Sequence, residues 1–167
     1  MEKKKSGIIM EYIPYIIVIV IAVVIKFFVV TPIRVNGESM MNTLHDGDIM
    51  VLNEISYKFS SIKRFDIVVI KHDDEYLIKR VIGLPGEEIE YIDGKLYVDG
   101  EEIEETFNHE ITADVLKIKV PDNEYYVLGD NRINSTDSRV IGTIPIKNIK
   151  GTTSLTIFPF SRFGRKN

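Results

Sequence analysis

Hydrophobic residues follow two different patterns along this chain. From Tyr12 to Val30 almost every residue is apolar, and the main interruptions are Pro14 and Lys26. The stretch has about the 20 residues that an α-helix needs to cross a bilayer core. No small-x-small cleavage site follows it, so we interpret it as an uncleaved anchor and not as a signal peptide. A buried core helix is the alternative, and the lack of a polar face argues against it.

The charges around this stretch predict its orientation. Three lysines, Lys3 to Lys5, precede it, and positive residues tend to stay in the cytoplasm. We therefore expect residues 1–11 on the cytoplasmic side, residues 12–30 across the membrane, and residues 31–167 as a translocated, extracytoplasmic domain. The expected location is a single-pass position in the cytoplasmic membrane, with the lipid bilayer as a partner.

Beyond residue 30, short apolar runs alternate with turn signals, a pattern typical of β-strands. Ile67–Ile70 and Tyr76–Ile82 flank a polar turn and predict a hairpin. The Asp-Gly pairs at 93–94 and 99–100 predict tight turns on either side of a strand, and Leu84-Pro85-Gly86 fits a type II turn. Further strands are expected at residues 125–128, 145–149 and 155–158.

These elements predict a mainly β fold, a compact antiparallel β-sheet domain with one N-terminal transmembrane helix. No internal repeat and no convincing helix are visible beyond the anchor. Residues 101–119 are acidic and weakly patterned, and we expect them to form a mobile surface insertion. The 137 residues after residue 30 are enough to bury a core without disulfides.

Composition narrows the possible functions. Residues 1–30 hold four of the 21 basic and two of the 25 acidic residues, so residues 31–167 carry 17 basic against 23 acidic side chains, a net charge of −6. Without a basic stripe, nucleic acid is not an expected partner. The chain has no cysteine, which excludes disulfides and thiolate sites. His45, His72 and His109 fit no zinc-binding spacing, and we expect them on the solvated surface, with no metal bound.

Lys79 is the first candidate for chemistry. Alternation along its predicted strand places it on one face with Leu77 and Val81. Burial against apolar neighbours disfavours the ammonium form and lowers the pKa of a lysine. A neutral lysine can act as a general base toward a serine hydroxyl. The alternative is a lysine that packs its stem on the strand and reaches water with its amine.

Ser39 is the second candidate and lies nine residues after Val30. Gly37 gives the chain a flexible approach to this serine, and the backbone amides around it could serve as oxyanion donors. Met40 and Met41 follow. We expect both to be exposed and suited to contact with lipid or an apolar substrate, with core packing as the alternative.

A polar loop is the third candidate. Residues 129–139 are dense in Asp, Asn, Ser and Arg and lie between predicted strands. Acids and arginines this close together can hydrogen-bond one another and fix a loop rigidly. Such a loop could present Ser135 to a lysine, although an ordinary solvated turn has a similar composition.

Four segments occur in an order that resembles a known family. Residues 39–44, 47–50, 79–86 and 129–139 closely resemble the four conserved boxes of the type I signal peptidases, the bacterial single-anchor kind, and residues 158–164 resemble the ending of that family. The resemblance implies a Ser/Lys dyad, with Ser39 as the nucleophile and Lys79 as the general base. It also implies that Ser135 orients the lysine amine, that Arg80 is structural, and that four residues brace the loop: Asp130, Arg132, Asp137 and Arg139.

What this family does sets the functional expectation. It removes signal peptides from exported preproteins, after small residues in an Ala-x-Ala pattern, on the outer face of the cytoplasmic membrane. The resemblance implies this membrane-bound serine endopeptidase activity for the chain, with no cofactor and no metal. The preprotein would lie extended beside the strand before Ser39 or the strand that carries Lys79. Val35, Ile78 and Met40 are candidates for lining its pockets.

Three positions depart from the family pattern. Asn42 stands where proline is usual, Gly37 where some members have a serine hydroxyl, and Leu77 where an aromatic residue is common. The first departure predicts a less stiff turn behind the nucleophile. The second leaves the oxyanion to backbone amides, and the third keeps an apolar neighbour for the lysine. The short region at 101–119 indicates a minimal version of the family.

Other functions would use the same residues differently. A self-cleaving Ser/Lys repressor has similar chemistry, but it carries a DNA-binding domain and no membrane span. Ser60-Ser61-Ile62-Lys63 matches the Ser-x-x-Lys motif of penicillin-binding enzymes without its partner motifs, and we interpret it as chance. The alternative function is that of a non-catalytic, membrane-tethered accessory factor, or of a variant dedicated to pilins or particular preproteins.

Overall fold

The computed structural model describes residues 11–21, 31–54 and 62–166. Residues 11–21 are helical, with exposed side chains. Within these three described ranges, no helix is long and apolar enough to cross a bilayer. Residues 22–30 of the predicted anchor lie outside the described residues, so the transmembrane helix stays a prediction.

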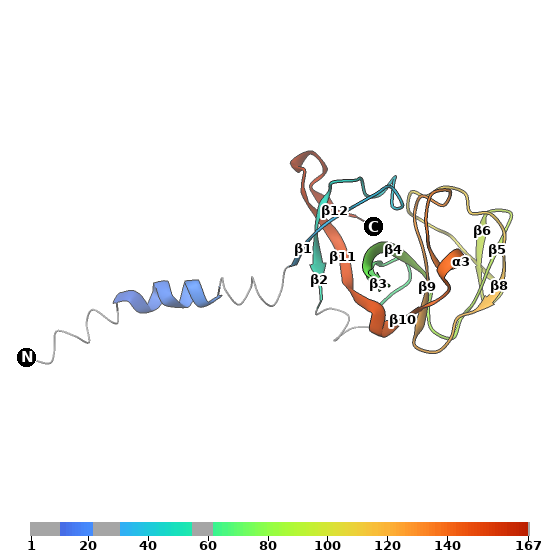
Figure 1. Cartoon of the computed structure of the whole chain (residues 1–167), viewed down its shortest axis with the longest axis horizontal. Helices are drawn as coiled ribbons and strands as arrows, with labels where there is room; N and C mark the ends of the chain where they lie inside the picture. Colours follow the sequence, from blue (N-terminus) through green and yellow to red (C-terminus); the bar gives the residue numbers. More distant parts are fainter. Residues whose placement is uncertain (1–10, 22–30, 55–61, 167) are drawn as a thin grey trace, which may run out of the picture.

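Antiparallel strands build most of the molecule, which confirms the mainly β fold (Figure 1). The larger sheet has eight strands, and its hydrogen-bonded order begins and ends at short strands. That order is β1 (Thr31–Arg34), β2 (Ile49–Asn53), β11 (Ile149–Phe158), β3 (Ile67–His72), β4 (Glu75–Gly83), β9 (Glu124–Leu128) and β10 (Ile144–Pro145), with β12 (Gly164–Arg165) paired to β11.

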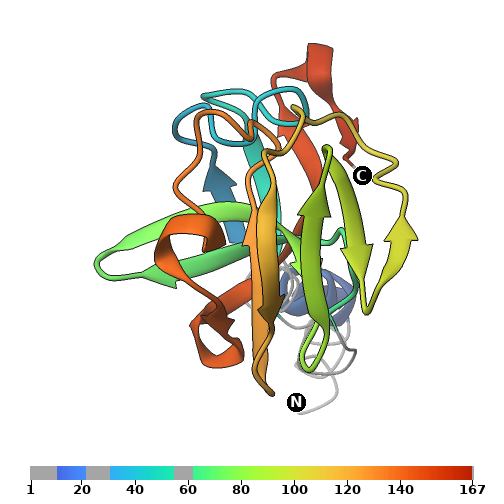
Figure 2. The ribbon, with the colours of Figure 1, turned by 90° about the vertical axis from the view of Figure 1, so that its right-hand side faces the viewer.

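A smaller sheet lies beside the larger one and faces the viewer in Figure 2. Its four strands are ordered β7 (Glu101–Ile103), β6 (Lys95–Val98), β5 (Glu88–Ile92) and β8 (Val115–Lys119). The described helices after residue 30 are single turns: α3 (Ser138–Ile141), η1 (Ile146–Asn148) and η2 (Phe160–Arg162).

Strand β4 is the wall that the core clusters share. Successive residues of a strand point to opposite faces, so Val81 belongs to one buried cluster while Ile82 belongs to the cluster that joins the two sheets. A third cluster lies under the turn between β1 and β2, and Ile78 packs against it. The residues on β4 are therefore held from both sides, and the strand is a rigid support for the side chains that it carries.

Most of the predicted strands and turns are confirmed. The hairpin is β3 and β4, with Ile70 opposite Leu77. The two Asp-Gly turns connect β5 to β6 and β6 to β7, and their aspartates and glycines all have the positive φ that such turns require. At the Leu84-Pro85-Gly86 turn, Gly86 has φ +80°, as position i+2 of a type II turn requires.

Two expectations need correction. Residues 145–149 were expected as one strand, but β10 ends at Pro145, η1 occupies residues 146–148, and β11 begins at Ile149; proline has no N–H with which to extend the ladder. Residues 101–119 begin and end with strands, β7 and β8, which pair with β6 and β5. Their pattern is weak because most of their side chains are solvent-exposed. Mobility of this insertion stays a prediction.

Candidate active site

The structure brings Ser39 and Lys79 into direct contact. Ser39 lies in the turn between β1 and β2, and Lys79 lies within β4. The amine Nζ of Lys79 donates a hydrogen bond of 2.7 Å to the hydroxyl Oγ of Ser39. Because 40 residues separate the two positions in the chain, only the fold can bring them together. The pair is oriented for transfer of a proton from the hydroxyl to a neutral amine.

Burial lowers the pKa of the Lys79 amine. Its side chain is 2% exposed, and this desolvation lowers its pKa from 10.5 to about 8. Two nearby carboxylates, Asp137 and Asp130, oppose the shift, while the positive charge of Arg139 adds to it. Leu77 and Val81 pack against one core cluster, as strand alternation predicts. A larger fraction of this amine is therefore neutral near pH 7 than for a lysine in water.

A buried ion pair ties β4 to the polar loop. The guanidinium of Arg80 donates to both carboxylate oxygens of Asp130, at 2.8 and 2.6 Å, and both side chains are fully buried. Arg80 also donates to the carbonyl of Phe65 at 2.9 Å. The hydroxyl of Thr43, four residues after Ser39, donates to Asp130 at 2.5 Å. Asp130 therefore joins three chain segments behind the candidate dyad.

A second ion pair lies inside the loop itself. Asp137 is fully buried and accepts two bonds of 2.8 Å from Arg139. Burial raises the pKa of Asp137, but the bonds from Arg139 and from the Gly129 amide, with a smaller effect of the Ser135 hydroxyl, outweigh it and lower the pKa overall. This carboxylate is therefore ionised and already satisfied by a cation other than the lysine.

Ser135 lies in the site without the contact expected of it. Its hydroxyl is buried and forms no hydrogen bond of good geometry with another described residue, so the predicted bond to the amine of Lys79 is not formed in this structure. It packs against Gly129, where an added Cβ would lie 2.3 Å from the Ser135 hydroxyl and 2.4 Å from the Ser39 carbonyl. Only glycine fits between these two groups.

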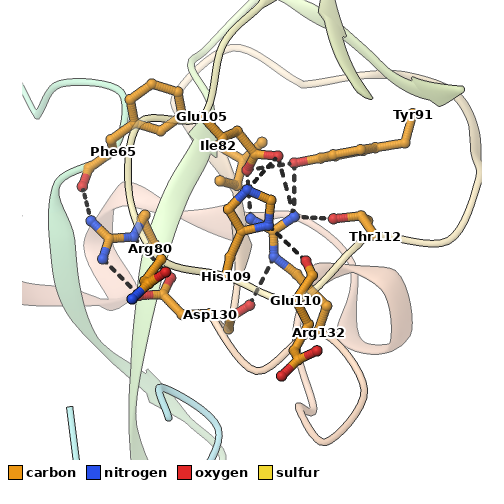
Figure 3. Close-up of polar contacts among 12 residues, drawn as sticks. Phe65, Arg80, Ile82, Tyr91, Glu105, His109, Glu110, Thr112, Asp130 and Arg132 are labelled. Atoms are coloured by element: carbon orange, nitrogen blue, oxygen red, sulfur yellow. Dashed lines mark hydrogen bonds and ion pairs between the residues drawn. The ribbon is translucent and has the colours of Figure 1, made fainter. Parts of the chain in front are cut away.

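Arg132 is buried farther from the dyad, and its partners were missed by sequence reasoning (Figure 3). It pairs with Glu105 and donates to Tyr91 and Thr112. Glu105 could not be distinguished from the other acids of the 101–119 region, because its burial depends on where that segment folds. His109 lies 3.7 Å from Glu105 with a side chain that is only 17% exposed, so the expectation of a solvated surface position is wrong for this histidine.

The candidate pocket residues line one small cavity with Ser39. Val35, Met40 and Ile78 border a space of about 60 Å³ beside Ser39. The expectation that Met40 is exposed is wrong: it is 1% exposed and packs in the cluster under the turn, whereas Met41 is 38% exposed. The buried methionine anchors the turn because the turn has few other apolar side chains.

A larger groove continues from this cavity. It has a volume of about 810 Å³ and shares with the cavity five residues: Arg34, Asn36, Tyr76, Leu77 and Ile78. Its walls include residues of β1 and β4. Strand β1 is at the edge of the sheet, and β4 pairs with β9 only from Arg80 onward. Among the described residues, two unpaired strand edges therefore face one groove.

The departures from the family pattern have local explanations. Asn42 has φ +86°, a conformation that proline cannot adopt because its ring holds φ near about −65°. The turn after Ser39 is thus left-handed at this residue. Gly37 has φ +85°, and its amide donates to Asp46 at 2.8 Å.

No group of three or more His, Asp or Glu that could hold a metal occurs in the described part of the chain.

Comparisons with known proteins show which family the chain belongs to. The family model for signal peptidase, peptidase S26, matches residues 9–158. Signal peptidase I S of Bacillus subtilis (strain 168) is 37% identical over 181 residues, covering 99% of this chain and 97% of the relative. Signal peptidase I V of the same organism is 43% identical over 155 residues, covering 83% and 92% of the two chains.

A solved structure shares the fold as well. The crystal structure of a signal peptidase I from Enterococcus faecalis V583 superposes with a TM-score of 0.51 at 32% identity, covering 56% of this chain and 97% of the other. Fold and sequence together define a β-sheet peptidase. The chain belongs to the signal peptidase family, peptidase S26.

Proposed function

We propose that the chain is a membrane-bound serine endopeptidase that removes signal peptides from exported preproteins, with Ser39 and Lys79 as a catalytic dyad. The observation that carries the proposal is the 2.7 Å contact between the lysine amine and the serine hydroxyl, on a lysine whose pKa burial lowers to about 8. Its relatives carry the name signal peptidase I, and the family model spans most of the chain.

The reaction uses the two side chains in sequence. Neutral Lys79 takes the proton of the Ser39 hydroxyl as the oxygen attacks the scissile carbonyl. The lysine ammonium then gives that proton to the leaving amine, and the peptide bond breaks to leave an acyl-enzyme. A water molecule, deprotonated by the same amine, hydrolyses the ester and restores the serine. Backbone amides of the Ser39 turn stabilise the oxyanion.

The groove suits an extended peptide. A preprotein segment between the free edges of β1 and β4 would gain main-chain hydrogen bonds from both strands, and its end would reach Ser39. The cavity of about 60 Å³ beside Ser39 admits only a small side chain, which supports cleavage after alanine-type residues. Val35, Met40 and Ile78 are the proposed lining of this cavity.

The predicted span at 12–30 completes the proposal. Strand β1 begins at Thr31, directly after that span, so an anchor there would hold the groove at the surface of the membrane. Enzyme and signal peptide would then share one bilayer, which raises their effective concentration. We place the catalytic domain on the extracytoplasmic face, where exported preproteins emerge.

Cleavage of a preprotein tests the proposal directly. The full chain in detergent is incubated with a preprotein that has an Ala-x-Ala site, beside the variants Ser39→Ala and Lys79→Ala. We expect cleavage by the wild type and a loss of at least about a thousandfold in each variant, because each removes a group that acts in the transition state. Lys95→Ala, at an exposed position of β6, is the matched control.

The results separate three conclusions. Activity near the wild-type rate in a folded Ser39→Ala or Lys79→Ala variant contradicts the dyad. No cleavage by the wild type on several such preproteins favours a peptidase dedicated to other substrates or an accessory factor. Binding of uncut preprotein by the intact chain, measured in the same detergent, then distinguishes these two.

A further inference from the structure

One connection of the smaller sheet reaches across to the candidate active site. Residues 105–112, which we call the strap, lie within the connection from β7 to β8 and contain no helix or strand. Figure 3 shows strap residues Glu105, His109, Glu110 and Thr112 around the guanidinium of Arg132, with Arg80 and Asp130 close by. The region expected to be a mobile insertion thus includes a segment in contact with the polar loop.

Glu105 makes the strongest contact of the strap. Its carboxylate is 4% exposed and pairs with Arg132, which is 1% exposed. The hydroxyl of Tyr91, from β5, donates to the same carboxylate at 3.0 Å, and Arg132 also donates to the Thr112 hydroxyl. A buried ion pair is costly unless its geometry and remaining hydrogen bonds are satisfied. Here each charge has at least one further partner.

Arg132 passes this constraint to the nucleophile. Its Nε donates to the carbonyl of Gly129 at 3.0 Å, and Gly129 lies against the carbonyl of Ser39 so closely that a Cβ would not fit. The next loop residue, Asn131, donates its amide to that same carbonyl at 3.1 Å. The position of the Ser39 backbone therefore depends on a loop that Arg132 holds in place.

The strap contacts the other buried arginine as well. The ring of Phe107 lies 4.0 Å from the guanidinium of Arg80, and the amide of Glu110 donates to the carbonyl of Asp130 at 3.0 Å. The strap thus contacts Arg80 as well as Arg132. Glu105 is the strap's only charged contact with Arg132 among the described residues.

We propose that Glu105 is a positioning residue of the active site. It holds Arg132 against the Gly129 carbonyl, and through that contact it fixes the Ser39 backbone at the correct distance from Lys79. The inference rests on the proposed dyad and deepens it, because it assigns the smaller sheet a role in catalysis. A misplacement of about 1 Å in a catalytic group can reduce a rate by about a hundredfold.

The test compares two neighbouring glutamates in the full chain in detergent. Glu105→Gln keeps the size of the side chain and removes its charge, whereas Glu104→Gln removes a charge from an exposed position. We expect Glu105→Gln to reduce kcat on the Ala-x-Ala preprotein by between about tenfold and a hundredfold, with KM changed by less than about threefold. Glu104→Gln is expected to match the wild type in both constants.

A second variant separates positioning from stability. Glu105→Gln leaves a buried guanidinium unpaired and should lower the melting temperature. The double variant Glu105→Met/Arg132→Met removes both charges, and such replacements often restore stability. We expect its melting temperature to return toward the wild-type value while kcat stays low, because the contact to Gly129 is still missing. A merely structural pair would recover both quantities together.

The pH profile gives a third readout. The charges that act on Lys79 are Asp137, Asp130 and Arg139, and Glu105 is not among them. If the loop loosens, water reaches the amine, so the acidic limb of kcat/KM should move to higher pH in Glu105→Gln. An unchanged kcat and an unchanged limb in a folded Glu105→Gln variant would overturn the inference. An inactive wild type would instead favour a peptidase dedicated to other substrates or an accessory factor, and Ser39→Ala is run in parallel to show that the measured cleavage belongs to the dyad.

Discussion

Two lysines on two strands have pKa values that are shifted in opposite directions. Lys79 in β4 is 2% exposed, and burial lowers its pKa to about 8. Lys95 in β6 has a side chain that is 57% exposed, and the hydrogen bond from its amine to Glu102, 3.0 Å long, raises its pKa. The amine of Lys79 instead donates to a neutral hydroxyl. The partner and the solvent, not the strand, decide which lysine can serve as a base.

The comparison explains why the site holds two Arg–Asp pairs. Two carboxylates act on Lys79, and either one at bonding distance would keep the amine protonated. Asp130 is bound by Arg80, and Asp137 is bound by Arg139. The desolvation of Lys79 outweighs the attraction to both carboxylates, and the positive charge of Arg139 lowers the pKa of the amine further. The pairs therefore brace the loop and keep both carboxylates bound to arginines and not to the amine of Lys79.

The largest effect expected from the difference between Lys79 and Lys95 is on the pH dependence of kcat/KM. Because Lys79 must be neutral to act, kcat/KM should fall by about tenfold for each pH unit below its pKa of about 8. Initial rates on a preprotein, measured from about pH 5.5 to 10, locate the limb. Lys95→Met should leave it unchanged. A limb near the ordinary value of 10.5 would mean that burial does not tune the amine.

A smaller effect concerns stability. The pKa of Lys79 falls from 10.5 in water to about 8 in the fold, and each pH unit corresponds to about 1.4 kcal/mol. The unfolded chain binds more protons between these two values, so stability rises with pH across that window. Below about pH 8 the full cost is present. Lys79→Met, which has no charge to bury, should therefore be more stable than the wild type at pH 7, by up to about 3 kcal/mol.

Urea unfolding at two pH values measures this difference. The advantage of Lys79→Met should shrink toward zero above about pH 10.5, where the lysine is neutral in both states. Lys95→Met should not show this gain at pH 7, because the hydrogen bond to Glu102 raises the pKa of Lys95 and burial does not lower it. A Lys79→Met variant that is less stable than the wild type at every pH would show that the contact with Ser39 outweighs the desolvation of the ammonium.

Sequence patterns predicted the local elements well because the signals for them are local. The β3–β4 hairpin follows from two apolar runs around a polar turn, and Lys79 could be assigned to an apolar strand face by alternation alone. The four family segments, in order, identified the residues that meet at the site. These signals need no knowledge of how the sheets are arranged.

The parts that escaped prediction depend on contacts between distant segments. Glu105 lies among other acids, and nothing in its neighbourhood distinguishes it until β5 brings Tyr91 beside it. Met40 was expected to be exposed, but the turn folds onto Met50 and Leu44 and buries it. Ser135 was expected to contact the lysine, and its hydroxyl packs against Gly129 instead. Tertiary packing decides each of these cases.

The smallest predicted effect concerns a turn beside each lysine. Asn42 near Lys79 has φ +86°, and Asp93 near Lys95 has φ +51°, so both turns hold a non-glycine residue in the left-handed region. Restoring the family proline with Asn42→Pro would force φ to about −65° and displace the Ser39 turn. We expect kcat/KM to fall by about tenfold, although proline is the usual residue there.

Asn42→Gly accepts the positive φ and should stay within about twofold of the wild type. Asp93→Gly should leave the rate unchanged, because that turn lies away from the dyad. Equal or higher activity in Asn42→Pro would show that the turn tolerates a negative φ at residue 42. Asn42 would then be a neutral replacement and not an adaptation of this chain.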